Sequence, residues 1–303
     1  MTEYFLGIDG GGSSCKARLE DQHGTLLATA ASGPANISHR LDRSVSAIAH
    51  VTRQVISLAG LSENVVTNIH TGIGLAGIGK VDIHGLSGKK HLVQQALAKK
   101  GLSFQTFTLT NDLYIACYGA HHGKNGSVVI IGTGSSALSL HDNKGQIKGG
   151  HGFLLGDQGS GAWLGKQAVS LVLLELDGLA EPSELSEQLL SFYSCRDKND
   201  VLRYFTNTEP YEFAKFAPFV IQLASSGHVG ATEIISQAAE FIDKLAQSVL
   251  KNQTQAFSLI GGLAKPILPF LSDKLVSRHQ EPLSCPTKGA ILYLKQWAKT
   301  NQP

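Results

Sequence analysis

The chain has 303 residues, of which 42% are hydrophobic and 17% charged, with a formal net charge of +2. The length suggests roughly two domains of an ordinary globular protein, and scattered Lys and Arg give no sign of a nucleic-acid footprint. Four widely spaced cysteines without a CxxC motif, at positions 15, 117, 195 and 285, argue against structural zinc and a disulfide framework. We therefore expect a protein of a reduced cytoplasm.

The first residues, MTEYFLGID, carry acids at Glu3 and Asp9, where a secretion signal needs a basic start and an apolar run. No segment approaches the ~18 uninterrupted apolar residues that span a membrane. Even the apolar run at 169–176 is brief and leads to Asp177. We expect a soluble protein without a membrane partner.

The N-terminal pattern predicts three strands around a glycine turn. An apolar run at 5–8 ends in three glycines, and the stretch that follows, CKARLE, alternates apolar and charged residues with the period of a strand. A turn at 21–24 then leads into a third strand at 25–30.

This arrangement excludes two common phosphate loops, since a dinucleotide fold and a P-loop both need their glycines to open a helix. A second glycine-rich stretch at 74–81 matches GxxxxGK but places Val81 where a P-loop needs Ser or Thr. We interpret that stretch as the end of a strand, with no helix before about His91.

The middle of the chain predicts helices at 41–58 and 91–100, a strand at 104–109 and a helix from Asp112 to about 120. The polar cluster at 121–126 marks a domain boundary. The opening pattern then recurs, because 128–145 contains an apolar strand, GTGSS, a second apolar strand and a DxxG turn. Such a repeat predicts two halves of related fold.

The rest of the chain is mostly helical, with helices expected at 160–176, 183–194, 211–223 and 232–250. A strand at 257–260 is followed by Gly261 and Gly262 and then by a last helical region.

Several of these stretches carry a family resemblance. The two glycine hairpins and the late IGGLAKPIL resemble the two phosphate motifs and the adenosine motif of the sugar kinase, actin and heat-shock chaperone superfamily. Within it, GGGSS, TLTNDLYIACYGA, IIGTGSSALS and GGHGFLLGDQGSGAWLG are similar to the N-acetylglucosamine and glucosamine kinases among the BadF/BadG/BcrA/BcrD-type ATPases. The motifs occur in order along nearly the whole chain.

The resemblance implies an α/β protein of two ribonuclease-H-like domains, the actin-like ATPase fold, with the active site in the interdomain cleft. Residues 1–121 would form the N-terminal domain and residues 122–303 the C-terminal domain, whose last helix can pack back on the first domain. A homodimer is the habit of this family.

Asp112 matches the catalytic base of the family, since phosphorylation of a sugar needs a carboxylate to accept the hydroxyl proton. On spacing alone it could be a first-turn acid that complements the helix dipole. Asp9 matches the acid that holds the magnesium ion of the nucleotide, for which one carboxylate suffices. Its alternative role is that of a polar turn residue.

The resemblance also assigns the nucleotide contacts. The β- and γ-phosphates of ATP would lie on backbone N–H and hydroxyl groups of both hairpins, and the purine and ribose on the adenosine motif. The residues are Gly10, Gly11, Gly12 and Ser13 in the first hairpin, Thr133 and Gly134 in the second, and Gly261, Gly262 and Lys265 in the adenosine motif. A single hairpin could be only a tight turn, whereas two matched copies favour a phosphate site.

The sugar contacts implied by the resemblance are Asn36, Asp112, Ser135, Ser136, Gly150, His151, Gly152 and Asp157. Asn36 and Asp157 can pair with vicinal hydroxyl groups. His151 departs from the animal enzymes, which have Trp there, while Gly150 and Gly152 keep the glycine frame of the enzymes for acetylated sugars. His151 could equally be a partly buried structural residue.

The sequence thus predicts an ATP- and Mg²⁺-dependent kinase for the 6-hydroxyl of an amino sugar, with N-acetylglucosamine slightly favoured over glucosamine. A glucosamine-specific kinase remains an alternative. Other classes of function on this fold are an ATPase activator of a radical dehydratase or reductase, which needs cluster cysteines, and a non-catalytic sugar sensor.

Overall fold

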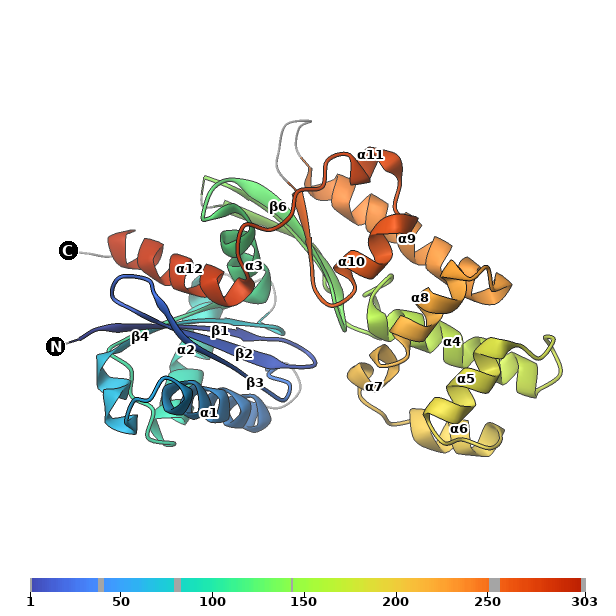
Figure 1. Cartoon of the computed structure of the whole chain (residues 1–303), viewed down its shortest axis with the longest axis horizontal. Coiled ribbons are helices and arrows are strands. Elements are labelled where there is room, and N and C mark those ends of the chain that lie inside the picture. Colours follow the sequence, from blue (N-terminus) through green and yellow to red (C-terminus); the bar gives the residue numbers. More distant parts are fainter. Residues whose placement is uncertain (1, 38–40, 79–82, 143, 251–256, 301–303) are drawn as a thin grey trace. The chain divides into compact units, whose positions relative to one another are not determined.

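The computed structural model describes residues 2–37, 41–78, 83–142, 144–250 and 257–300 (Figure 1). Their contacts divide the chain into two units. Unit 1 comprises Met1–Val128, Leu138–Gln146 and Glu281–Pro303, and unit 2 comprises Val129–Ala137 and Ile147–Gln280. Residues 79–81 of the GxxxxGK stretch lie outside the described residues.

A five-stranded sheet forms the centre of unit 1, in the order β3-β2-β1-β4-β5. Its strands are β1 (Tyr4–Gly10), β2 (Cys15–Asp21), β3 (Leu26–Ser32), β4 (Ile69–Leu75) and β5 (Thr106–Asn111). β1 is antiparallel to β2 and parallel to β4, and β4 is parallel to β5. The strand interpretation of CKARLE is confirmed, and the fully buried Cys15 packs in the core of this unit.

Helices cover both faces of this sheet (Figure 1). On one side lies α1 (Leu41–Leu58), whose buried side chains recur at helical spacing at Val45, Ile48 and Val55. On the other lie α3 (Asp112–His121) and α12 (Pro286–Thr300). The expectation of no helix before about His91 is wrong, because α2 spans Ile83–Ala98. The short glycine-containing stretch before His91 shows no clear apolar period, so the pattern alone misses this first half.

The second sheet repeats the strand order of the first. It comprises β6 (Gly126–Ile131), β7 (Ser135–His141), β8 (Lys144–Gly149) and β9 (Phe257–Ile260), in the order β8-β7-β6-β9. In both sheets three consecutive strands lie side by side, and the next strand of the sheet pairs with the first of the three. The predicted α/β class with two related halves is therefore confirmed.

The other helices of unit 2 follow α4 (Gly161–Leu176). They are α5 (Glu184–Phe192), α6 (Lys198–Phe205), α7 (Pro210–Ala214), α8 (Ala217–Ser225), α9 (Val229–Val249), α10 (Ala264–Ile267) and α11 (Asp273–Val276). The single helix expected at 211–223 is two helices, because Pro218 lies in the first turn of α8 and starts a new helix. Two 3₁₀ helices span Glu63–Asn68 and Leu268–Phe270.

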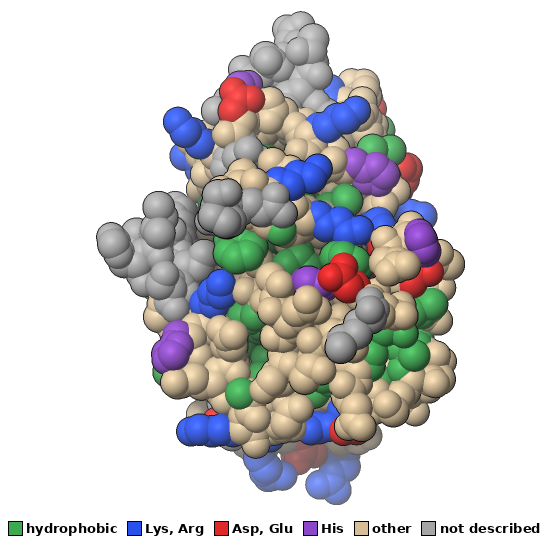
Figure 2. All heavy atoms as spheres, turned by 90° about the vertical axis from the view of Figure 1, so that its left-hand side faces the viewer, with side chains coloured by type: hydrophobic (Ala, Val, Ile, Leu, Met, Phe, Trp, Pro, Cys, Tyr) green, Lys and Arg blue, Asp and Glu red, His purple; other side chains and the backbone are tan. Residues whose placement is uncertain are grey.

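The surface shows no sorting of charge on the face drawn in Figure 2, where Lys and Arg side chains are spread out with Asp, Glu and His among them. This distribution agrees with the near-zero net charge of the chain. Within the described residues, no helix combines the length and apolar character needed to cross a bilayer.

Helix α12 lies with its backbone directly against β1, β4 and α3, at positions where glycine leaves no side chain between them. A Cβ on Gly7 of β1 would overlap the carbonyl oxygen of Thr287, and a Cβ on Gly72 of β4 would overlap that of Ala290. The reverse contact also occurs, since a Cβ on Gly289 would overlap the backbone of α3. The C-terminal helix is thus an integral part of unit 1.

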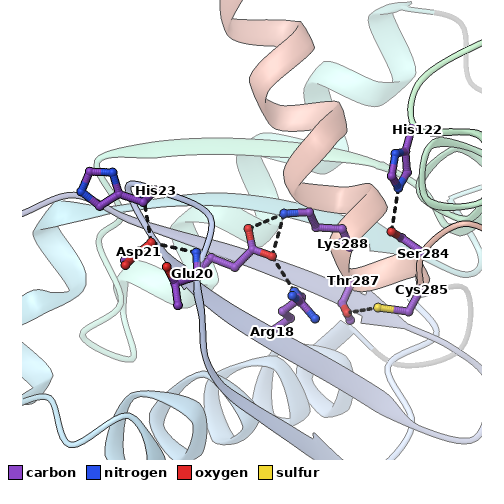
Figure 3. Close-up of polar contacts among 10 residues, drawn as sticks. Arg18, Glu20, Asp21, His23, His122, Ser284, Cys285, Thr287 and Lys288 are labelled. Atoms are coloured by element: carbon purple, nitrogen blue, oxygen red, sulfur yellow. Dashed lines mark hydrogen bonds and ion pairs between the residues drawn. The ribbon is translucent and has the colours of Figure 1, made fainter.

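A buried ion pair holds this helix in register (Figure 3). The carboxylate of Glu20 on β2 is fully buried and accepts hydrogen bonds from Lys288 Nζ at 2.7 and 2.8 Å. Arg18 Nε donates a further hydrogen bond to it at 2.6 Å. Lys288 lies between Thr287 and Gly289, the two residues of α12 that touch β1 and α3, so the ion pair secures both backbone contacts.

Lys288→Met should lower the free energy of unfolding by about 2–4 kcal/mol, because it leaves a buried carboxylate with one cation instead of two. Lys198→Met is the matched control. Lys198 Nζ contacts Asp177 at 2.5 Å, but both side chains are more than one-third exposed, so its removal should cost no more than about 1 kcal/mol. Urea denaturation of the three proteins measures both losses, and equal losses would contradict the structural role of Lys288.

Candidate active site

Two carboxylates lie at one edge of the first sheet. Asp9 is near the end of β1, and Asp112 follows the last residue of β5. Since β1, β4 and β5 are parallel, their carboxyl ends meet at the same edge. Burial raises the pKa of Asp9 to about 6, against the opposing charge of Lys16. Burial, and next the charge of Asp9, raise the pKa of Asp112 to about 7.

The start of α3 explains why Asp112 is held at this edge. The backbone N–H of Leu113 donates to Asn111 Oδ1 at 2.8 Å, so Asn111 is the capping residue of the helix. Asp112 Oδ1 accepts from the same N–H at 3.0 Å. The capping role is therefore filled without Asp112, whose carboxylate keeps a raised pKa.

The first glycine hairpin is joined by backbone hydrogen bonds to two other loops. Gly11 N–H donates to Ser14 O at 2.8 Å and closes the turn, and Gly11 O accepts from Ala35 N–H at 3.0 Å. Ala76 N–H donates to the carbonyl of Gly10 at 2.8 Å, and the carbonyl of Ala76 accepts from the residue after Asn36. The loop that carries Asn36 is thus bonded to the predicted phosphate hairpin directly before Asn36 and through Ala76 after it.

The second glycine hairpin, in unit 2, is joined to the start of α4. Gly132 N–H donates to Gly134 O at 3.0 Å, while Gly132 O accepts from Gly161 N–H at 2.8 Å. The carbonyl of Thr133 accepts from Ala162 N–H at 3.3 Å. These bonds fix the backbone of Thr133 and Gly134, the two predicted phosphate contacts of this hairpin.

Asp157 of unit 2 combines two unusual features. Its φ of +58° lies in the left-handed region, and its buried Oδ1 has no hydrogen-bond partner among the described protein atoms. Burial raises the pKa of Asp157, while backbone N–H groups and the charge of His151 oppose that rise. A strained backbone that holds an unpaired buried oxygen is typical of a ligand site.

The predicted sugar residues of unit 2 surround Asp157. Ser135 is buried and donates its hydroxyl hydrogen to Gln158 O at 2.7 Å, while its carbonyl accepts from Gly150 N–H at 3.0 Å. A Cβ on Gly150 would lie 3.2 Å from Ser136 Cβ. Gly152 and His151 are both exposed, so the partly buried structural role considered for His151 is wrong. Unit 2 therefore brings Ser135, Ser136, residues 150–152 and Asp157 together.

The two glycines of the predicted adenosine motif differ sharply. Gly261 has a φ of +112°, and a Cβ there would overlap the backbone of Ile131. At Gly262 and at Gly132 an added Cβ would meet no atom within 4 Å, and neither has a positive φ. Lys265 is exposed on α10. Gly261 is thus required by the fold, whereas Gly132 and Gly262 face open space.

One charged residue beside the site was not predicted. Lys16 pairs with Asp9 across β1 and β2 and is exposed, and its charge lowers the pKa of Asp9. The signal was available in principle, because the strand period and the length of the glycine turn together define this register.

Comparison with known proteins identifies the family. Residues 6–293 match the BadF/BadG/BcrA/BcrD ATPase family. The chain belongs to this family. The resemblance predicted from the motifs is therefore confirmed, and the fold is that of actin-like ATPases.

Three relatives of this family member cover most of its length. The glucosamine kinase of Vibrio cholerae is 29% identical over 290 residues, which is 96% of this chain and 95% of that protein. The N-acetyl-D-glucosamine kinase of Dictyostelium discoideum is 27% identical over 82% of this chain and 80% of its own. The crystal structure of a proposed N-acetylglucosamine kinase from Chromobacterium violaceum is 29% identical, covers 96% of this chain and 99% of its own, and superposes with a TM-score of 0.85.

Asp112→Asn should stabilise this ATPase-family member at alkaline pH. Because the folded-state pKa of Asp112 lies above its ordinary value of 3.8, its contribution to stability is complete below that value and is lost as the pH rises through about 7. The variant should exceed the wild type by about 1–3 kcal/mol in unfolding free energy at pH 8 and match it at pH 3.5. Urea denaturation at both pH values measures this, with the exposed Asp273→Asn as control; a variant less stable at pH 8 contradicts the electrostatic cause.

Proposed function

We propose that the chain is an ATP-dependent amino-sugar kinase that transfers the γ-phosphate of ATP to the 6-hydroxyl of the sugar. The observation that carries this proposal is Asp112, a carboxylate with a pKa of about 7 at the start of α3. A base with a pKa near the working pH is suited to accept the proton of a hydroxyl group. The similarity to a glucosamine kinase over 96% of the chain supports an amino sugar as the substrate whose hydroxyl group this base would deprotonate.

In the proposed reaction, the oxygen of the 6-hydroxyl bonds to the γ-phosphorus as the bond from that phosphorus to the leaving ADP oxygen breaks. The hydroxyl proton passes to the carboxylate of Asp112. The N-terminal cap at Asn111 fixes the backbone of Asp112 for this role. Positioning and charge stabilisation supply most of the catalysis in such a transfer.

The residues present fit a magnesium ion at Asp9. Among the described residues no group of three or more His, Cys, Asp and Glu side chains could hold a metal alone, but Mg²⁺ bound to a nucleotide needs only one or two carboxylates. Asp9 is partly buried at the strand end, and among the described residues no group donates a hydrogen bond to its carboxylate that would compete with the ion. A bound Mg²⁺ would neutralise charge on the phosphates, and Asp9 would hold it.

Each glycine hairpin supplies part of the nucleotide site in this proposal. Gly10, Gly11, Gly12 and Ser13 would bind phosphate from unit 1, and Thr133 and Gly134 would bind it from unit 2. Open space at Gly132 and Gly262 supports close approach of a ligand to the backbone. Lys265 and Gly261 complete the adenosine site, the latter by shaping the turn.

For the sugar, we propose that Asp157 accepts hydrogen bonds from vicinal hydroxyl groups through its unpaired Oδ1. Asn36 would contribute from unit 1, where its loop is tied to the glycine hairpin. N-acetylglucosamine is slightly favoured over glucosamine because residues 150–152 keep the Gly-X-Gly frame. His151 is exposed and its charge acts on Asp157, and in this proposal it would contact the sugar or its substituent.

The activator alternative is disfavoured by the positions of the cysteines. Such activators need cysteines at cluster motifs, and the four widely spaced cysteines of this chain include no CxxC motif. All four cysteines are free, which supports a reducing compartment, and we propose that the protein is cytoplasmic. We further propose that it is a homodimer that acts on small molecules and has neither nucleic acid nor membrane as a partner. We also keep the domain division at 121 and 122 as a proposal.

The purified protein should release ADP in the presence of Mg²⁺, ATP and an amino sugar, with higher kcat/KM for N-acetylglucosamine than for glucosamine, and with little activity on glucose. Asp112→Asn should lower kcat by about 10²–10⁴-fold, because the hydroxyl proton loses its acceptor. A coupled ADP-release assay with the three sugars measures both effects. Absence of sugar-dependent ADP, or an unchanged rate in Asp112→Asn, would refute the proposed function.

The glycine pair 261 and 262 offers a matched test of the nucleotide site. Gly262→Val should raise the KM for ATP by about tenfold or more at unchanged Tm, because the new side chain points into open space that the nucleotide would fill. Gly261→Ala should instead lower Tm, since its Cβ overlaps Ile131 and its φ is +112°. Initial-rate kinetics and thermal unfolding separate the two, and an unaltered KM in Gly262→Val argues against the assigned adenosine site.

A further inference from the structure

Gly74 lies in the same row of the sheet as Asp9. On the central strand β4 it pairs with Asp9 of β1 on one side and with Thr110 of β5 on the other. Side chains alternate along a strand, so Gly74 faces the same side as Gly72, the side against which α12 packs. Gly74 therefore separates the strand that carries Asp9 from the strand that leads to Asp112.

This glycine is required by a contact and not by its backbone conformation, since its φ is not positive. A Cβ on Gly74 would overlap Cδ1 of Ile115 and would lie 2.5 Å from Cγ1 and 2.9 Å from Cγ2 of the same side chain. Ile115 belongs to α3 and follows Asp112 by three residues, close to one helical turn. The first turn of α3 thus rests directly on the backbone of β4.

Ile115 has little freedom to avoid an added methyl group. Its side chain is fully buried, and a β-branched side chain in a helix is largely confined to one χ1 rotamer. The backbone around Ile115 is held from the other side, where its carbonyl oxygen touches Gly289 of α12. A side chain at position 74 would therefore displace the first turn of α3 and not just one rotamer.

We propose that Gly74 is a positioning residue: it sets how closely the first turn of α3 approaches β4, and thereby where the carboxylate of Asp112 lies relative to Asp9. The inference rests on the proposed role of Asp112 as the base. It assigns a function to part of the GxxxxGK stretch that the phosphate motifs do not use.

Three variants test this inference: Gly74→Ala, Ile115→Ala and the double variant. Gly74→Ala should lower kcat by about 30- to 100-fold, because a displacement of about 1 Å can cost a factor of this size. The KM for ATP should change less than about threefold, since the glycine hairpins are untouched. Ile115→Ala removes all three atoms that a Cβ at position 74 would meet, so the double variant should recover kcat to within about threefold of Ile115→Ala alone.

A second readout does not depend on activity. Hydrogen exchange of the amides at 113–116 should be faster in Gly74→Ala than in the wild type and should return to the level of Ile115→Ala in the double variant. Binding of the ATP analogue AMPPNP, measured by calorimetry, should be the same in all four proteins. This combination separates a displaced α3 from general loss of structure.

The inference is overturned if Gly74→Ala keeps a kcat within about threefold of the wild type with unchanged exchange at 113–116, or if the double variant is no better than Gly74→Ala. Should Gly74→Ala fail to fold, the double variant decides: recovery to the level of Ile115→Ala supports the inference, and failure to recover overturns it. Should the wild type lack sugar-dependent ADP release, the proposed function fails, while hydrogen exchange alone still decides whether Gly74 positions α3.

Discussion

The close approach of α12 and α3 to the central strands of unit 1 is the constraint on which the rest of the site depends. Helices normally pack on a sheet through side chains from both elements, but here Gly7 and Gly72 let the backbone of α12 touch the strands, and Gly74 lets the Ile115 side chain of α3 rest on the backbone of β4. Asp9 follows the first of these glycines by two residues, and Asp112 begins the helix that rests on the last. Both carboxylates are therefore attached to backbone that has little room to shift, and the ion pair of Glu20 with Lys288 fixes the covering helix.

Holding these side chains in place lowers the stability of the folded protein. Burial raises the pKa values of Asp9 and Asp112 and so disfavours their ionised forms, and the charge of Asp9 raises the pKa of Asp112 further. Asp157 of unit 2 adds a positive φ and a buried oxygen that has no hydrogen-bond partner in the described part of the chain. Such unfavourable features persist only when many surrounding contacts hold the backbone in place. The capped start of α3 and the bonded loops around the two hairpins provide these contacts.

The sequence predicted what depends on local pattern. The period of two after Gly12 identified β2, and the repeated strand–glycine–strand pattern identified two halves whose sheets share one strand order. It could not predict contacts between distant residues: Glu20 and Lys288 are 268 positions apart, and nothing near either marks the other as its partner. The break between α7 and α8 has a local signal in Pro218, which the apolar period alone does not report. The first half of α2 shows no clear apolar period, so periodicity alone misses it. For the candidate site, the residue types were predictable from motifs, and the register that places Lys16 beside Asp9 was predictable in principle from the strand period and the turn length. The burial of Asp112 and the strained backbone of Asp157 were not predictable in this way.

The glycines show most clearly why the sequence alone does not define the site. Gly261 is required by a positive φ, Gly74 by a neighbouring side chain, and Gly262 by neither. In the sequence the three are indistinguishable, and a motif that contains Gly261 and Gly262 suggests one role for both. The structure distinguishes a glycine that the fold requires from one that the fold would allow to be substituted. Gly132 and Gly262 are of the second kind, and the open space beside them is compatible with the close approach of a molecule to the backbone that the proposed nucleotide site requires.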